Sequence, residues 1–218
     1  MEIAADNPAL YVSLDNQFIP AMEYTYTYDN ASVRRVKNPI WWQSTVTSAG
    51  NVTATIYRAF GKPYNEEGKK LLGAPFSQFM KFNTEFRHLW NMDKNNKIAS
   101  RVALGALFAY GEQFYVGGAN SIRAFTVRSI GPGGYHPKDS KYSYLDQTGT
   151  FRFEANVEYR FRIFKSIWGA TFLDEGNVWL LRKDEARPDS QLRLKTFPKQ
   201  IALGTGVGVR YDMDILVF

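Results

Sequence analysis

The dominant pattern along this chain is an alternation of apolar and polar side chains with a period of two residues. From Phe151 to Arg162 every odd position is apolar, and the even positions hold two glutamates, three arginines and an asparagine. Successive side chains of a β-strand point to opposite faces, so this segment predicts a strand with one apolar and one charged face. A second such strand covers 200–211 and has glycine at three consecutive positions of its polar face, which leaves room for another segment to pack there.

Five more segments with this alternation bring the number of predicted strands to seven. They cover about residues 19–30, 39–50, 76–90, 98–110 and 167–180. A strand length of roughly 12–15 residues exceeds the ~5–6 usual in soluble sheets and fits the ~9–11 that cross a bilayer at a tilt. The connections between the strands alternate in length, the short ones being 31–38, 91–96 and 163–166 and the long ones 51–75, 112–148 and 182–197. Short turns on one side and long loops on the other are typical of an outer-membrane barrel.

The fold class predicted from these strands is all-β, an antiparallel transmembrane β-barrel. Residues 212–218 have the pattern of a turn and the start of another strand. Seven strands and the start of another do not close a barrel, and open strand edges are not tolerated in lipid. We therefore expect an incomplete barrel, in which residues 1–218 are one portion of a longer barrel domain whose final strands are missing.

Composition narrows the classes of function. No stretch approaches the ~18 apolar residues of a transmembrane helix, and the mean hydropathy of −0.35 is compatible with strands that carry a polar residue at every second position. The chain lacks cysteine, which removes thiol catalysis and cysteine-based metal sites. The net charge of +6 is dispersed, so we assign it to lumen and loop positions and predict no nucleic-acid partner. Because the sequence contains no nucleophile elbow and no phosphate-binding loop, we expect neither an enzyme nor a cofactor.

The most informative segment lies in the long connection 112–148. It runs from Gly117 to Phe125 and contains one charged residue, Arg123. A solvated loop has no need to keep Ile122 and Phe125 around an arginine, whereas a loop that folds back into a polar cavity does. We therefore predict that this loop enters the lumen of the barrel.

Two further predictions concern a turn and the tryptophans. Gly131-Pro132-Gly133-Gly134 predicts a flexible turn further along the same loop. Four tryptophans are assigned as anchors at the membrane interface rather than as ligand-binding residues, namely Trp41, Trp42, Trp168 and Trp179.

Three motifs occur in order along the chain. The loop carries Ile122-Arg123-Ala124-Phe125 after Gly117 and Gly118, the next strand carries Asn156-Val157-Glu158-Tyr159, and the following one carries Phe172-Leu173-Asp174-Glu175-Gly176-Asn177-Val178-Trp179. Together they resemble the BamA/TamA family of outer-membrane assembly barrels, also called the bacterial surface antigen family. That family has a Val/Ile-Arg-Gly-Phe/Tyr motif in its sixth extracellular loop, an inward glutamate, and a Phe-x-Asp-x-Gly-x-x-Trp strand. Here Ala124 replaces the glycine of the loop motif, which indicates a backbone without a positive φ.

The resemblance implies a structure and a site. The chain would be the C-terminal half of a sixteen-strand barrel in the bacterial outer membrane, without POTRA domains. Arg123 would meet Glu158 and Asp174 beside Gly176 on the inner wall. An arginine in a confined lumen needs carboxylates to balance its charge, and its planar guanidinium can bind two of them at once. This contact would pin the loop inside the barrel.

The resemblance also implies a function and partners. The whole protein would insert or export other outer-membrane proteins, which reach it unfolded, and would meet periplasmic partners through POTRA domains absent from these residues. Its outer surface would contact membrane lipid and lipopolysaccharide. Two alternatives remain open from the sequence: a two-partner secretion transporter that exports one cognate protein, and a passive porin or surface barrel.

Overall fold

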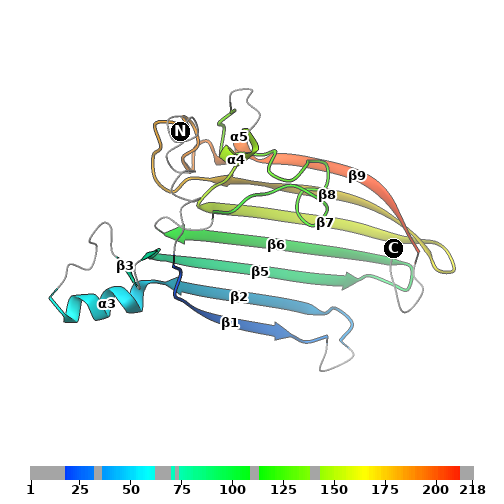
Figure 1. Ribbon diagram of the computed structural model, residues 1–218. Helices are drawn as coiled ribbons and strands as arrows, with labels where there is room; N and C mark the ends of the chain where they lie inside the picture. Colours follow the sequence, from blue (N-terminus) through cyan, green and yellow to red (C-terminus); the bar gives the residue numbers. More distant parts are fainter. Residues whose placement is uncertain are drawn as a thin grey trace.

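The computed structural model describes residues 18–31, 36–61, 70–71, 74–108, 113–137 and 143–211. Their main feature is a seven-stranded sheet in the order β1-β2-β5-β6-β7-β8-β9. The strands are β1 (Ala21–Asp29), β2 (Ile40–Ala49), β5 (Phe79–Asn91), β6 (Asn96–Phe108), β7 (Phe151–Phe164), β8 (Ile167–Trp179) and β9 (Ala202–Tyr211). Every neighbouring pair is antiparallel, and the sheet is open at β1 and β9 (Figure 1).

All seven predicted strands are present, and the predicted alternation of short and long connections is also confirmed. The strand ends joined by residues 30–39, 92–95 and 165–166 lie together at one end of the sheet, here called the turn end, and the strand ends joined by the long connections lie at the other, the loop end (Figure 1). Residues 212–218, in which we predicted the start of another strand, lie outside the described residues.

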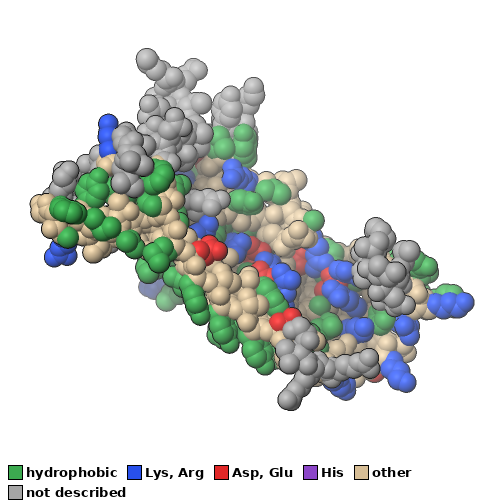
Figure 2. Space-filling view, turned by 60° about the horizontal axis from the view of Figure 1, so that its bottom comes forward, with side chains coloured by type: hydrophobic (Ala, Val, Ile, Leu, Met, Phe, Trp, Pro, Cys, Tyr) green, Lys and Arg blue, Asp and Glu red, His purple; other side chains and the backbone are tan. Residues whose placement is uncertain are grey.

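One face of the sheet is charged and the other is apolar. The strand register causes this, because it places charged side chains beside charged ones and apolar side chains beside apolar ones. Arg101 pairs with Asn156, and its guanidinium bridges Glu85 and Glu154 at 2.9 Å each, so these side chains share one face, the inner face. Figure 2 shows Lys, Arg, Asp and Glu side chains gathered along the middle of the visible surface, beside a row of hydrophobic side chains. The opposite, outer face carries exposed apolar side chains on all seven strands, among them Tyr24, Val46, Phe82, Val102, Val157, Leu173 and Val207.

Helices are few and short. They are α3 (Asn51–Ala59), α4 (Ser143–Asp146) and α5 (Phe197–Gln200), and a small hairpin joins β3 (Lys70–Leu71) to β4 (Ala74–Pro75). The sequence pattern did not predict α3, because a helix of nine residues gives only a brief signal, the four-residue spacing of Val52, Ile56 and Phe60. None of the described helices is long and apolar enough to cross a membrane.

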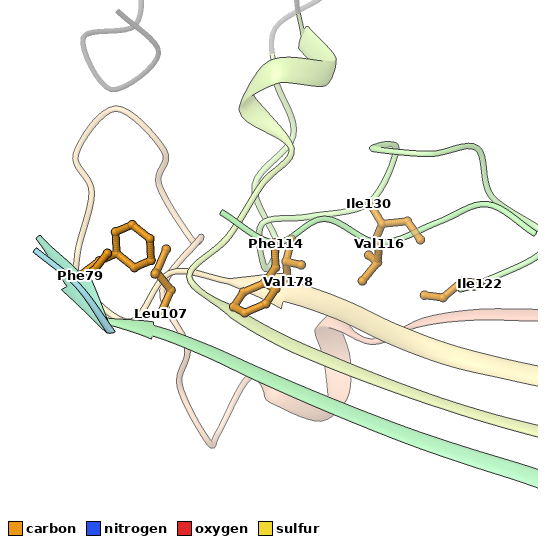
Figure 3. Close-up of a cluster of buried hydrophobic side chains, with 8 residues drawn as sticks. Phe79, Leu107, Phe114, Val116, Ile122, Ile130 and Val178 are labelled. Carbon is orange, nitrogen blue, oxygen red and sulfur yellow. The ribbon is translucent and has the colours of Figure 1, made fainter. Parts of the chain in front are cut away.

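The buried apolar core lies between the inner face and the loop of residues 113–137. Figure 3 shows Val116, Ile122 and Ile130 from the loop lying near Val178 of β8, close to Phe114. The whole cluster consists of Ala49, Phe79, Leu107, Phe114, Val116, Ile122, Ile130 and Val178. The loop therefore supplies half of this cluster, as a segment that folds back onto the sheet would.

The segment Gly131–Gly134 is packed against the sheet, so the prediction of a flexible turn is wrong. Pro132 is fully buried. The Gly133 amide donates to the Val178 carbonyl at 2.6 Å, and the Asn177 side chain donates to the Gly133 carbonyl at 3.0 Å. Glycines here allow the backbone to approach the end of β8 closely, which a turn signal in the sequence does not distinguish from flexibility.

Of the four tryptophans assigned as interfacial anchors, one lies on the outer face of the sheet, as an anchor must. Trp42 lies on the outer face with 43% of its surface exposed. Trp41 and Trp168 face inward, each against a cationic side chain, and Trp179 is fully buried, where it stacks on a ring of α5. Adjacent strand residues point to opposite faces, so two neighbouring tryptophans do not both reach lipid. Trp90, which we did not assign, is exposed on the outer face.

The first prediction tests the lipid-facing side of the sheet. Val157 lies on the outer face of β7 between Ser100 and Leu173, with 47% of its surface exposed. We expect Val157→Arg in the full-length protein to destabilise the barrel by about 2–4 kcal/mol near the membrane midplane. The measurement is urea-dependent folding into liposomes. Ala99→Arg on the inner face of β6, opposite Glu158, is the matched control and should fold normally. Equal stability of the two variants would contradict the assignment of the faces.

Candidate functional site

The predicted loop motif forms a compact turn. Gly117 and Gly118 have φ values of 100° and 94°, which glycine adopts without strain. The Gly118 amide donates to the Phe125 carbonyl at 2.8 Å, and the Phe125 amide donates to the Ile122 carbonyl at 3.1 Å. These bonds close residues 118–125 on themselves and direct Arg123 toward the sheet. The positive φ values of described non-glycine residues lie elsewhere, so the prediction made for the alanine of the motif is confirmed.

Arg123 lies against two carboxylates of the inner face. Its backbone amide and its Nε atom donate to Oδ2 of Asp174 at 3.0 Å and 2.8 Å, and its Nη2 atom donates to Oδ1 at 2.8 Å. Its Nη1 atom donates to Oε2 of Glu158. The Phe172 ring covers one flat face of the guanidinium, whose carbon atom lies 3.6 Å from the ring centre. The structure thus brings together the arginine and both carboxylates named from the sequence.

Burial makes this contact strong. Asp174 has no exposed surface, and the Glu158 side chain is 7% exposed, while the Arg123 side chain is 26% exposed. Hydrogen bonds to Asp174 raise the pKa of the Arg123 guanidinium above its ordinary value, although burial opposes that shift. Arg123 is therefore charged throughout the physiological pH range.

The contact continues into a network that sequence reasoning missed. Asn156 donates to the Ser121 carbonyl at 2.8 Å and to Oδ1 of Asp174 at 2.9 Å, so it binds both loop and wall. Arg101 donates to Oδ1 of Asn156 at 3.0 Å, which joins the Arg123 contact to a second cluster of charges. On the other side, Arg160 and Arg210 bind Oε1 of Glu158 at 2.7 Å and 2.8 Å. The signal was available, because every one of these residues is polar at an inward position of its strand.

Glycines of the inner wall receive the apolar part of the motif. A Cβ atom at Gly176 would lie 3.2 Å from Cδ1 of Ile122, and one at Gly204 would lie 2.8 Å from Cβ of Ala124. The glycine face predicted for the last strand therefore does make room for another segment. Phe125, the last residue of the motif, packs against the apolar core.

These features define a class of protein. Strands of nine to fourteen residues with an apolar outer face, a charged inner face and a long loop bound to the inner face form part of an outer-membrane β-barrel. Residues 21–216 match the model of the Omp85 superfamily domain, so this chain belongs to the Omp85 superfamily. Members are bacterial outer-membrane proteins, which confirms the location, the fold class and the family predicted from the motifs.

This chain is also similar to solved structures. BamA from Haemophilus ducreyi lacking POTRA domains 1–3 matches with a TM-score of 0.48 and 15% sequence identity, over 88% of this chain and 48% of that chain. This chain thus spans about half the length of that protein.

The second prediction tests the fit of the loop into the glycine recess. Gly204→Ala places a methyl group against Ala124, and we expect this overpacking to destabilise the loop by about 1–3 kcal/mol. Ala124→Gly in the same protein should restore protection of the loop against protease, because it removes the opposing methyl. Gly208→Ala is the matched control on the same face of β9, where a Cβ atom would meet nothing within 4 Å. If the second substitution restores nothing, the two residues do not pack as described.

Proposed function

We propose that this chain is the C-terminal half of an outer-membrane barrel that inserts or translocates other proteins, and that Arg123 pins its long loop in the lumen. The observation that carries the proposal is the set of hydrogen bonds between Arg123 and Asp174, reinforced by Glu158. Membership of the Omp85 superfamily supports the same function. The partners proposed for the whole protein are unfolded or exported outer-membrane proteins, periplasmic proteins bound through POTRA domains, and membrane lipid with lipopolysaccharide.

The physical argument for pinning rests on what each partner would lose alone. A carboxylate with no exposed surface, such as Asp174, is stable in its charged form only while cationic and hydrogen-bonding partners compensate it. If the loop moves away from the wall, Arg123 loses its hydrogen bonds to Asp174. The charges therefore favour one position of the loop. Nothing in this arrangement calls for catalysis or a cofactor, and we propose a mechanical role.

The passive-porin alternative is disfavoured because the loop occupies the inner face with a dedicated ion pair rather than leaving an open channel. A two-partner secretion transporter would use the same pinned loop. The two proposals differ in what the whole protein handles, which is many barrel substrates in one case and one cognate protein in the other.

The third prediction tests the pin. Arg123→Ala leaves Asp174 buried without its cation, and we expect the loop to lose up to about 3–5 kcal/mol of stabilisation. Residues 117–125 should become accessible to added protease in the full-length barrel, while the strands stay folded. Asp174→Asn and Glu158→Gln should have weaker effects, because each leaves one carboxylate for the arginine.

A double-mutant cycle separates the contact from indirect effects. Removing Arg123 and Asp174 together should be less harmful than the sum of the single changes. Arg128→Ala is the control in the same loop, since the Arg128 guanidinium lies over Tyr115 and forms no ion pair with a described carboxylate. Zero coupling in the cycles of Asp174 and of Glu158 would mean that the loop is held in another way.

The fourth prediction tests the activity. Full-length protein in liposomes should accelerate the folding of a reporter outer-membrane barrel added in urea, and Arg123→Ala should reduce that acceleration several-fold. The measurement is the heat-modifiable gel shift of the reporter over time. Failure to accelerate any reporter, combined with export of one cognate protein, would favour the two-partner transporter instead.

A further inference from the structure

The inner face near the turn end carries an excess of positive charge. The cationic side chains there are Arg87, Lys97, Arg160, Arg162 and Arg210, on four different strands. The inward carboxylates of described residues near them are Asp29, Glu85 and Glu158. Glu85 binds Arg87, and Glu158 binds Arg160 and Arg210, so the cations still outnumber the carboxylates. Lys and Arg side chains gather toward the right-hand side of Figure 2, which is the turn end of Figure 1. The excess lies where a barrel of this class opens to the periplasm.

This charge surrounds an open space. A hollow of about 850 Å³ is bounded by β1, β2, β5, β6, β7, β9 and the tip of the loop. Three cations of the turn end, Arg87, Arg160 and Arg210, line it. The Arg87 side chain donates from Nε to Glu85 at 2.5 Å, and it is 58% exposed, so the rest of its guanidinium is accessible to a ligand in the hollow.

Tryptophans hold several of these cations in place. The Arg87 guanidinium lies 4.7 Å from the ring of Trp41, and Lys97 and Arg162 lie 4.7 Å and 5.1 Å from the ring of Trp168. Among described residues, no carboxylate forms an ion pair with Lys97 or Arg162. A guanidinium stacked on an indole keeps its N–H edge free for a carboxylate, and its fixed position reduces the entropy lost on binding. Lys97 and Arg162 are therefore available to an anionic partner, whereas Arg87 also binds Glu85 through its Nε atom.

The spread of the cations indicates the size of that partner. The span from β5 to β9 covers four spacings of about 4.8 Å, or roughly 19 Å. This is too wide for one small anion, and it matches about six residues of an extended polypeptide at ~3.3 Å per residue.

We propose that the turn end of the inner face is a binding site for an extended acidic segment of polypeptide that enters the barrel from the periplasmic side. Glutamate and aspartate side chains of that segment bind the edges of Arg87 and Arg162 and the ammonium of Lys97. The inference goes beyond the proposed function. The site requires that the turn end be open, but it does not depend on insertion activity.

The test uses the full-length protein in nanodiscs of phosphatidylcholine. The probe is a fluorescent peptide of alternating glutamate and glycine, about ten residues long, and the reference peptide has glutamine in place of glutamate. By fluorescence anisotropy the acidic peptide should bind at least about tenfold more tightly, and its affinity should fall as added salt screens the charges. The double variant Lys97→Gln and Arg162→Gln should weaken binding about tenfold. Arg87→Gln, on the other side of the hollow, should weaken it severalfold on its own.

The matched control is the double variant Arg182→Gln and Lys183→Gln, which removes the same charge from exposed residues at the loop end. It should bind the acidic peptide like the unchanged protein. Equal affinity for the acidic and neutral peptides, or equal weakening in the control, would overturn the inference. The reporter-folding assay on the same samples keeps the two proposals apart, because a barrel that accelerates folding and shows no preference for the acidic peptide refutes this site alone.

Discussion

The hydrogen bonds between the Arg123 guanidinium and the Asp174 carboxylate are the interaction on which the rest of the inner face depends. Asp174 is fully buried on β8, so a cation must reach it, and that cation comes from a loop rather than from a neighbouring strand. The position of the loop follows from this need. Once Arg123 is in place, Ile122 enters the apolar core, and Asn156 joins the loop backbone to the wall. Charge neutralisation and apolar burial thus favour the same conformation.

The strands were predictable because a sheet with lipid on one side and water on the other imposes a strict period of two. From Phe151 to Arg162 no position departs from that rule, and the structure reproduces the predicted faces. The site was predictable in part. Arg123 was conspicuous as one charge among glycine and apolar residues, and its two carboxylates followed from a resemblance to a family rather than from the spacing of residues. The contact with Asp174 joins residues 51 positions apart, a separation about which periodicity carries no information.

Other features were not predictable from local pattern, because tertiary contacts decide them. The Gly131–Gly134 segment has the composition of a mobile turn, yet its backbone groups bind the end of β8, and only the folded chain supplies those partners. Trp168 has the composition of a membrane anchor, yet it lies under Lys97 and Arg162 on the inner face. The network around Arg101 was readable in principle, since each member stands at an inward polar position. The sequence alone does not show which of the inward carboxylates each arginine binds.

The placement of the two carboxylates has a mechanical consequence. Glu158 and Asp174 belong to β7 and β8, whereas β9 contributes the surface of Gly204 and the side chain of Arg210. Separation of β9 from β8 would break a ladder of backbone hydrogen bonds and uncover the methyl group of Ala124. Every hydrogen bond of Arg123 would remain. The charged support of the loop therefore lies one strand inside the edge of the described sheet and does not depend on the pairing of β8 with β9.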